Sequence, residues 1–209
     1  MARFLSLLPF VLPCKFCRKS LTEYFAILPF TTALSSQKAL SAWMYKVHNK
    51  VNEKLKSQGL PVAPIPTLKE VNSKYESYLE QGCSRTVFLG WEFLFSILDN
   101  HPYSKEGQKT TPFECPAPPV TDIDKNRFNT LTPDERIPYI IAFFEVLPRV
   151  LPYKEWEESW GSGCDSDSKY PCKEIAKGRR QAIAWLWKIR RGLEADFDLQ
   201  NKDTKRQSG

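Results

Sequence analysis

The sequence predicts an all-α protein, a bundle of helices, and two observations lead to this prediction. Apolar residues recur at spacings of three and four in several segments that end near Pro or Gly, and no segment shows sustained alternation of apolar and polar residues. The chain of 209 residues is long enough for one domain or two small ones, and 42% of it is apolar. A core can therefore form, which excludes global disorder and collagen-like structure.

The first half of the chain is expected to form helices separated by prolines. Residues 4–30 form helical segments that Pro9 and Pro13 split, and Pro13 suits the first turn of the helix at 14–28. A periodic helix follows at 37–56, and a Pro-rich linker then leads to a polar helix at 67–81. One apolar stripe runs along the 37–56 helix: Leu40, Trp43, Val47, Val51 and Leu55.

The second half is expected to contain three further helices. An apolar helix at 87–100 stops before Pro102, and residues 103–126 resemble a loop in composition. Pro133 at the first helical position opens a helix that runs to Pro148. The remaining segments are a loop at 161–172, a last helix at 173–195 and a polar, disordered tail at 198–209.

Two segments of the first half recur in the second half. Residues 8–17 align with 147–156 at an offset of 139, with six of ten positions identical. Residues 43–47 align with 185–189 at an offset of 142. Because the two matches occur in the same order, they predict the duplication of a helical module.

The two copies differ in their chemistry and in their extent. Cys14 and Cys17 of the first copy correspond to Tyr153 and Trp156 of the second, so function is expected in the first copy. The first copy also lacks the opening helix that the second has around Trp91. We therefore divide the chain into a partial module at 1–58, a linker and polar helix at 59–84, a degenerate second module at 85–197 and the tail.

Charge and hydropathy exclude further classes. The formal charge of +6 is modest and both signs are interspersed, so no nucleic-acid partner is indicated. No stretch approaches the roughly 20 apolar residues that a membrane span needs. The apolar residues 4–13 could belong to a signal peptide or to a buried helix. Pro9, Pro13 and the lack of a small-x-small cleavage site favour the buried helix.

Cys14 and Cys17 form a C-x-x-C motif at the start of a predicted helix. A helix N-terminus stabilises a thiolate through its partial positive charge and its free N–H groups, and neighbouring basic residues add to this effect. The motif alone fits a redox pair, half of a zinc site or two buried thiols. A zinc site would need two more ligands, such as His48 and Cys83, and no second close cysteine pair follows, so no metal is predicted.

The 37–56 helix carries polar groups that suit a cofactor. His48 and Asn52 are four residues apart and share a face, with Asn49 to one side. Beside the aromatic surface of Trp43, these groups could hold a planar cofactor with a polar edge. A solvated surface helix is the alternative reading of the same residues.

The combination of these two motifs resembles the Erv/ALR family of FAD-dependent sulfhydryl oxidases. In that family a C-x-x-C helix is followed by a helix with a Trp and a His-Asn-x-Val-Asn pattern. Here the Trp follows the second cysteine by 26 residues. The residues that match are Cys14, Cys17, Trp43, His48, Asn49, Val51, Asn52 and Leu55. Family members of large DNA viruses sometimes carry a second, cysteine-free module, so the resemblance also suggests a viral or protist origin.

The resemblance implies a helical bundle that holds FAD at the C-x-x-C. A substrate dithiol would attack Cys14, Cys17 would leave as a thiolate, and electrons would pass through FAD to oxygen to give hydrogen peroxide. Lys54 is expected to reach the FAD phosphates, and Trp43 to stack near the cofactor. The other cofactor-binding residues implied are His48, Asn49, Val51 and Asn52.

The partners implied are protein or small-molecule dithiols and oxygen, without nucleic acid or membrane, and a homodimer is compatible with this reading. A cytoplasmic location (virus factory or virion) or the mitochondrial intermembrane space is favoured over secretion. The competing function is a non-catalytic helical scaffold or interaction protein that keeps the fold and has lost turnover.

Four cysteines remain outside the motif. Cys164 and Cys172 bracket a short loop, where they could form a structural disulfide, act as a mobile shuttle pair for Cys14 or stay free. Cys83 and Cys115 flank the Trp91 helix, and their pairing does not follow from the sequence.

Overall fold

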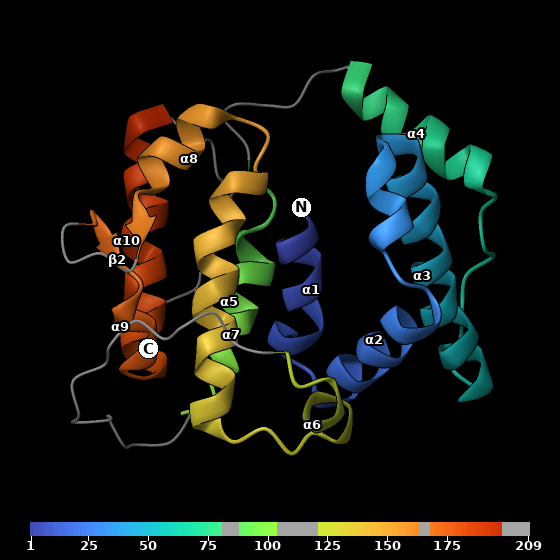
Figure 1. Ribbon diagram of the computed structural model, residues 1–209. Helices are drawn as coiled ribbons and strands as arrows, with labels where there is room; N and C mark the ends of the chain where they lie inside the picture. The colour runs from blue at the N-terminus through green and yellow to red at the C-terminus, as the bar shows by residue number, and fades with distance from the viewer. Residues whose placement is uncertain (81–87, 104–120, 164–167, 198–209) are drawn as a thin grey trace.

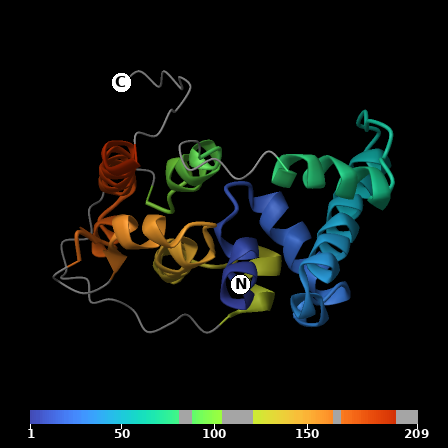
Figure 2. The same ribbon diagram turned by 90° about the horizontal axis from the view of Figure 1, so that it is seen from above.

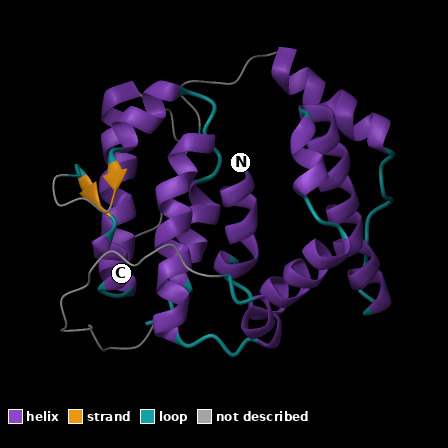
Figure 3. Cartoon of the chain, in the orientation of Figure 1, coloured by secondary structure: helices purple, strands orange, loops and turns teal. Residues whose placement is uncertain are grey.

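Helices make up nearly all of the regular structure, which confirms the predicted all-α class (Figure 1, Figure 3). The computed structural model describes residues 1–80, 88–103, 121–163 and 168–197. In these ranges the only strands are β1 (Ser162–Gly163) and β2 (Tyr170–Pro171), which pair in parallel. The predictions for Cys83, Cys115, Cys164 and the tail lie outside the described residues.

The first half forms four α-helices in the predicted order. The C-x-x-C opens the second of them, and the long periodic helix is the third. Their bounds, with one 3-10 helix between the second and third, are α1 (Ala2–Val11), α2 (Lys15–Ile27), η1 (Thr31–Ser35), α3 (Gln37–Ser57) and α4 (Leu68–Glu80).

The second half forms shorter helices around two long ones. Thr132 caps the first long helix with its hydroxyl, and Glu135 completes a capping box there. The bounds are α5 (Trp91–Asp99), α6 (Ile123–Phe128), α7 (Pro133–Val146), η2 (Leu147–Val150), α8 (Lys154–Trp160), α9 (Lys173–Ala176) and α10 (Arg179–Phe197).

Two predicted boundaries were wrong. Helix α1 continues through Pro9, because a proline in the last turn removes a single hydrogen bond, the one to Leu5. The predicted helix at 173–195 is broken at Gly178, whose φ of +139° only glycine adopts readily. The break separates α9 from α10.

Helix α6 lies at the end of the segment 103–126 that was predicted to be a loop, so this prediction was also wrong there. Asp122 accepts a hydrogen bond from the Lys125 N–H and caps the helix. Asn129 ends it in the left-handed conformation, with φ of +57°. These two residues are a start and a stop signal that the sequence contains, and six residues are too few to show an apolar period.

Helix α1 joins the two halves of the molecule. It lies beside α7 in both views (Figure 1, Figure 2). Leu7, Phe10 and Val11 are buried in the large core formed with α5, α7 and α10. Leu5, on another side of α1, belongs to a smaller core with Trp43 and Val47 of α3. The N-terminal residues therefore form a buried helix in this structure.

Helices begin at equivalent positions in the two copies of the predicted repeat. Helices α2 and α8 begin at Lys15 and Lys154, at the offset of 139, and α3 and α10 begin at positions 142 apart. Phe4 and Phe143, which the offset of 139 makes equivalent, stack with ring centroids 5.4 Å apart. Residues near a two-fold axis meet their equivalents in this way. These equivalences fit the duplication, which stays a prediction, as does the domain division.

A buried histidine ties α5 to the α9 segment. His101 is only 2% exposed, its Nε2 lies 2.8 Å from the Ile175 carbonyl oxygen, and its Nδ1 accepts from the Tyr103 N–H. These partners require the neutral ring with the proton on Nε2. Burial accordingly lowers the pKa of His101 to about 4.

Acid is therefore expected to destabilise the fold through His101. Its pKa is lower in the folded chain than in the unfolded chain, so the unfolded chain binds the proton first and stability falls as pH drops from about 6.5 to 4. The loss should approach about 3 kcal/mol. Urea unfolding at pH 7, 5.5 and 4.5 measures it, with His101→Gln as the control that lacks the titrating ring. An equal pH slope in both proteins between pH 6.5 and 4.5 would contradict the assignment.

Candidate functional site

The two cysteines of the C-x-x-C lie at the N-terminus of α2, as predicted. Cys14 is the N-cap residue, and its Sγ accepts a hydrogen bond from the Cys17 N–H at 3.4 Å. Both cysteines are exposed free thiols in this structure. The exposed side chain of Phe16 stands between them in the sequence, with the Lys15 ammonium 5.1 Å from its ring centroid. A dithiol substrate could reach this surface.

The environments of the two thiols differ. The pKa of Cys14 is lowered, first by a hydrogen bond with the Cys17 thiol and then by backbone N–H groups at the helix start and the charge of Arg18. Burial raises the pKa of Cys17, and the interaction with Cys14 raises it further. The charges of Lys54 and Arg18 act in the opposite direction on Cys17. In the reduced pair, Cys14 is therefore the sulfur that ionises first.

Lys54 connects α3 to the C-x-x-C helix. Its Nζ donates a 2.6 Å hydrogen bond to the Ser20 hydroxyl of α2, and its charge favours the thiolate form of Cys17. The predicted role of Lys54 was a phosphate contact, which nothing in the structure tests. The hydrogen bond to Ser20 places Lys54 about one turn of α2 from Cys17, a proximity that their separation of 37 residues in the sequence does not reveal.

Trp43 lies in the interface between α2 and α3. It is 6% exposed, its ring contacts Phe25 at 5.1 Å and Phe30 at 6.0 Å between centroids, and its Nε1 donates to the Leu28 carbonyl. Val47, one turn further along α3, is buried in the same small core. Trp43 thus holds the end of α2 against α3.

His48 and Asn52 lie on another side of α3. The Asn52 amide nitrogen is 3.4 Å from His48 Nδ1, and the His48 side chain is exposed. At 100° per residue they share a side with Ser41 and Tyr45. Those two residues bond to Asn72 of α4 and to the Pro66 carbonyl of the segment before it. This is the side that faces α4, so His48 and Asn52 do not lie beside Trp43.

The remaining residues predicted to bind the cofactor are accessible. Asn49 is half-buried, and Val51 is 39% exposed although it belongs to the apolar stripe. The structure therefore brings Cys17 and Lys54 together at the α2–α3 interface and places the amide groups on a second side of α3. Helix α3 is the element that joins these two groups of residues.

Cys172 has the properties of a structural thiol. It is fully buried in the large core, and burial raises its pKa to about 12. A shuttle cysteine needs access and thiolate character, and Cys172 has neither in this conformation. Its suggested pairing with Cys164 is untested, because Cys164 lies outside the described residues.

Two more properties concern the described residues as a group. They contain no cluster of three or more His, Cys, Asp or Glu side chains arranged to hold a metal ion. None of their helices combines the length and the apolar character that crossing a membrane would require.

Sequence reasoning missed the buried polar residues that support the motif. From the sequence Arg18 is one of several basic residues near the motif, yet it is buried, and Asn126 of α6 and its C-cap Asn129 bond to the α2 region. These contacts join positions more than one hundred residues apart. A left-handed cap such as Asn129 is the one local signal that could have marked the segment.

One comparison with known proteins found a match, and it covers the segment that carries the two motifs. The sequence model of the Erv1/Alr family matches residues 1–74, the range from α1 into α4 that includes both cysteines and the His-Asn-x-Val-Asn pattern. No curated protein and no solved structure matched the chain. The helical bundle and the exposed C-x-x-C at a helix N-terminus fit this match, and over residues 1–74 the chain is similar to the Erv1/Alr family.

Proposed function

We propose that this protein is an FAD-dependent thiol oxidase that forms disulfides in protein or small-molecule dithiols and delivers the electrons to oxygen as hydrogen peroxide. The observation that supports this most directly is the geometry of the pair at the start of α2. Cys14 is an exposed helix cap with a lowered pKa, and Cys17 lies beside the charge of Lys54.

The order of attack in the proposed thiol chemistry comes from the family resemblance and from the exposure of Cys14. A substrate thiolate attacks Sγ of Cys14 in the oxidised pair, the Cys14–Cys17 bond breaks, and Cys17 leaves as a thiolate. The charges of Lys54 and Arg18 favour this thiolate, while burial and Cys14 raise its pKa. The second substrate thiolate then attacks the substrate sulfur of the mixed disulfide. Cys14 leaves readily because its pKa is low. The substrate departs as a disulfide, and the pair holds two more electrons.

The residues on α3 fit FAD by their chemistry. Amide and imidazole groups at positions 48, 49 and 52 can bond to the polar edge of a planar ring, and the ammonium groups of α3 can neutralise phosphate. FAD, when bound, would accept the electron pair from the dithiol and pass it to oxygen. The chain itself orients the two sulfurs, sets their acidity and holds α2 against α3.

The presence of flavin is the first test. Purified full-length protein, or protein reconstituted with FAD, is expected to absorb at about 450 nm and to release peroxide when it consumes oxygen with a dithiol. Protein that stays colourless after reconstitution would overturn the oxidase assignment. Thiol-disulfide exchange without peroxide would indicate a redox protein that uses no flavin.

A specific observation keeps the scaffold function as a second candidate. The apolar side of α3 is uncovered at Met44, which is 46% exposed, and at Val51. A protein that binds no FAD but remains folded would support this candidate.

A further inference from the structure

Arg18 is a buried cation at the turn that leads into Cys14. Its side chain is 5% exposed, although it follows Cys17 in the sequence. One guanidinium nitrogen donates to the carbonyls of Leu12 and Pro13, at 2.8 and 3.1 Å. These are the two carbonyls before Cys14, so Arg18 fixes the turn that presents the first sulfur.

The partners of Arg18 are neutral. Its other terminal nitrogen donates to the side-chain oxygen of Asn129 at 3.0 Å, and within the described residues it forms no ion pair with a carboxylate. A buried guanidinium without a counter-ion is costly. The groups whose negative charge Arg18 senses are the thiols of Cys14 and Cys17. Ionisation of the pair therefore supplies the charge that the site lacks.

Helix α6 supports the junction between α1 and α2, where Arg18 lies. Asn126 is 2% exposed, and its amide nitrogen donates to the Pro9 carbonyl of α1 and to the Thr22 hydroxyl of α2. The Pro9 carbonyl needs such a donor because residue 13, its helical partner, is a proline without an N–H. The Thr22 hydroxyl in turn donates to the Arg18 carbonyl. Helix α6 thus fixes α1 and α2 at their junction.

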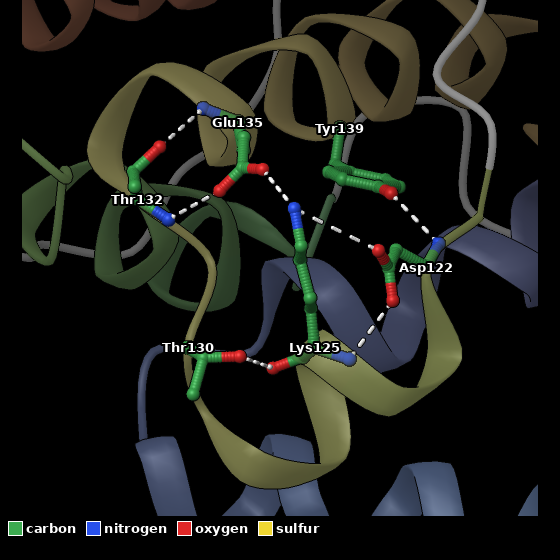
Figure 4. Close-up of polar contacts among 6 residues, drawn as sticks. All are labelled: Asp122, Lys125, Thr130, Thr132, Glu135 and Tyr139. Carbon is green, nitrogen blue, oxygen red and sulfur yellow. Dashed lines mark hydrogen bonds and ion pairs between the residues drawn. The ribbon is translucent and has the colours of Figure 1, made fainter.

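The position of α6 is set by α7 (Figure 4). The Lys125 ammonium forms an ion pair with Glu135, the acidic member of the capping box of α7, and lies 3.9 Å from Asp122. The Tyr139 hydroxyl accepts from the Asp122 N–H. The same tyrosine stacks on Phe10 of α1 at 4.1 Å between centroids. A continuous set of contacts leads from α7 through α6 to Arg18.

We propose that Arg18 is a positioning residue that favours the thiolate forms of Cys14 and Cys17, and that Asn129 of α6 makes this effect depend on the second half of the chain. The inference deepens the proposed function and rests on it only in taking this pair as the reacting group. It assigns the cysteine-free helices α6 and α7 a part in thiol chemistry.

The decisive variant is Asn129→Asp. Aspartate tolerates the left-handed backbone of residue 129, and its carboxylate gives Arg18 the counter-ion it lacks. The reduced full-length protein is alkylated with iodoacetamide from pH 6 to 9, and mass spectrometry follows Cys14. We expect the rate at pH 7 to fall about 3- to 10-fold, because the thiolate fraction falls. Phe128→Asp is the matched control, since residue 128 is 65% exposed and water screens its charge.

A second variant separates charge from structure. Arg18→Gln keeps a donor toward the two carbonyls and removes the charge, so it should slow alkylation of Cys14 at least as much as Asn129→Asp. The proposal is overturned if Asn129→Asp and Phe128→Asp agree within twofold, and also if folded Arg18→Gln keeps the wild-type rate profile. If Arg18→Gln does not fold, Asn129→Asp decides alone. Alkylation needs no flavin, so a failure of the oxidase assignment leaves this result interpretable.

Discussion

Cys17→Ser is expected to reduce dithiol-dependent oxygen consumption at least about 100-fold while the protein keeps its fold and its flavin. A hydroxyl cannot form the disulfide with Cys14 that a substrate must attack, and it is no leaving group in the exchange. The replacement should not disturb packing, because Cys17 is exposed. The measurements are oxygen uptake with dithiothreitol, the flavin absorbance and the far-ultraviolet circular dichroism of the variant.

Cys172→Ala is the matched control for this experiment. Cys172 is fully buried and burial raises its pKa to about 12, so its removal should leave oxygen uptake within about twofold of wild type. Turnover retained in Cys17→Ser would refute the role of the C-x-x-C. Turnover lost in folded Cys172→Ala would instead support the shuttle role suggested for the loop cysteines.

Phe143→Ala is expected to lower the free energy of unfolding by about 3–5 kcal/mol. Phe143 is fully buried and contacts Phe4 of α1, Phe144 of α7 and Phe93 of α5 at centroid distances of 5.4, 5.4 and 6.4 Å. Its removal leaves a cavity where the two halves of the molecule meet. Urea unfolding monitored by circular dichroism measures the loss.

Phe128→Ala provides the comparison for Phe143→Ala. Phe128 is 65% exposed at the end of α6, so its truncation should change the free energy of unfolding by no more than about 0.5 kcal/mol. Similar losses in the two variants would mean that Phe143 does not lie in the core that α1 and α7 share.

The long helices were predictable because each has its own local signals. The apolar period defines α3, and the capping residues Thr132 and Glu135 define the start of α7. The C-x-x-C at the start of α2 was predictable for the same reason, since Cys14 directly follows Pro13. These elements depend on residues within a few positions of one another.

What the sequence could not supply is the set of contacts between distant segments. Nothing near Lys54 predicts that it bonds to Ser20, and nothing near Arg18 predicts that it is buried against Asn129. The apolar stripe of α3 also overestimated burial, since Val51 is exposed while Trp43 is covered. The spacing of apolar residues in a sequence indicates which of them share a side of a helix. Whether that side is buried depends on the neighbouring helices.

The position of α1 has a consequence for how such a chain can evolve. The helix belongs to the segment that matches the sulfhydryl oxidases, yet Leu7 and Val11 are almost wholly enclosed by the other half. Loss of that half would uncover the apolar side of α1 and remove the asparagines that support α2. Selection on the half that has the C-x-x-C would thus also retain the half that lacks the motif, and the two must change together.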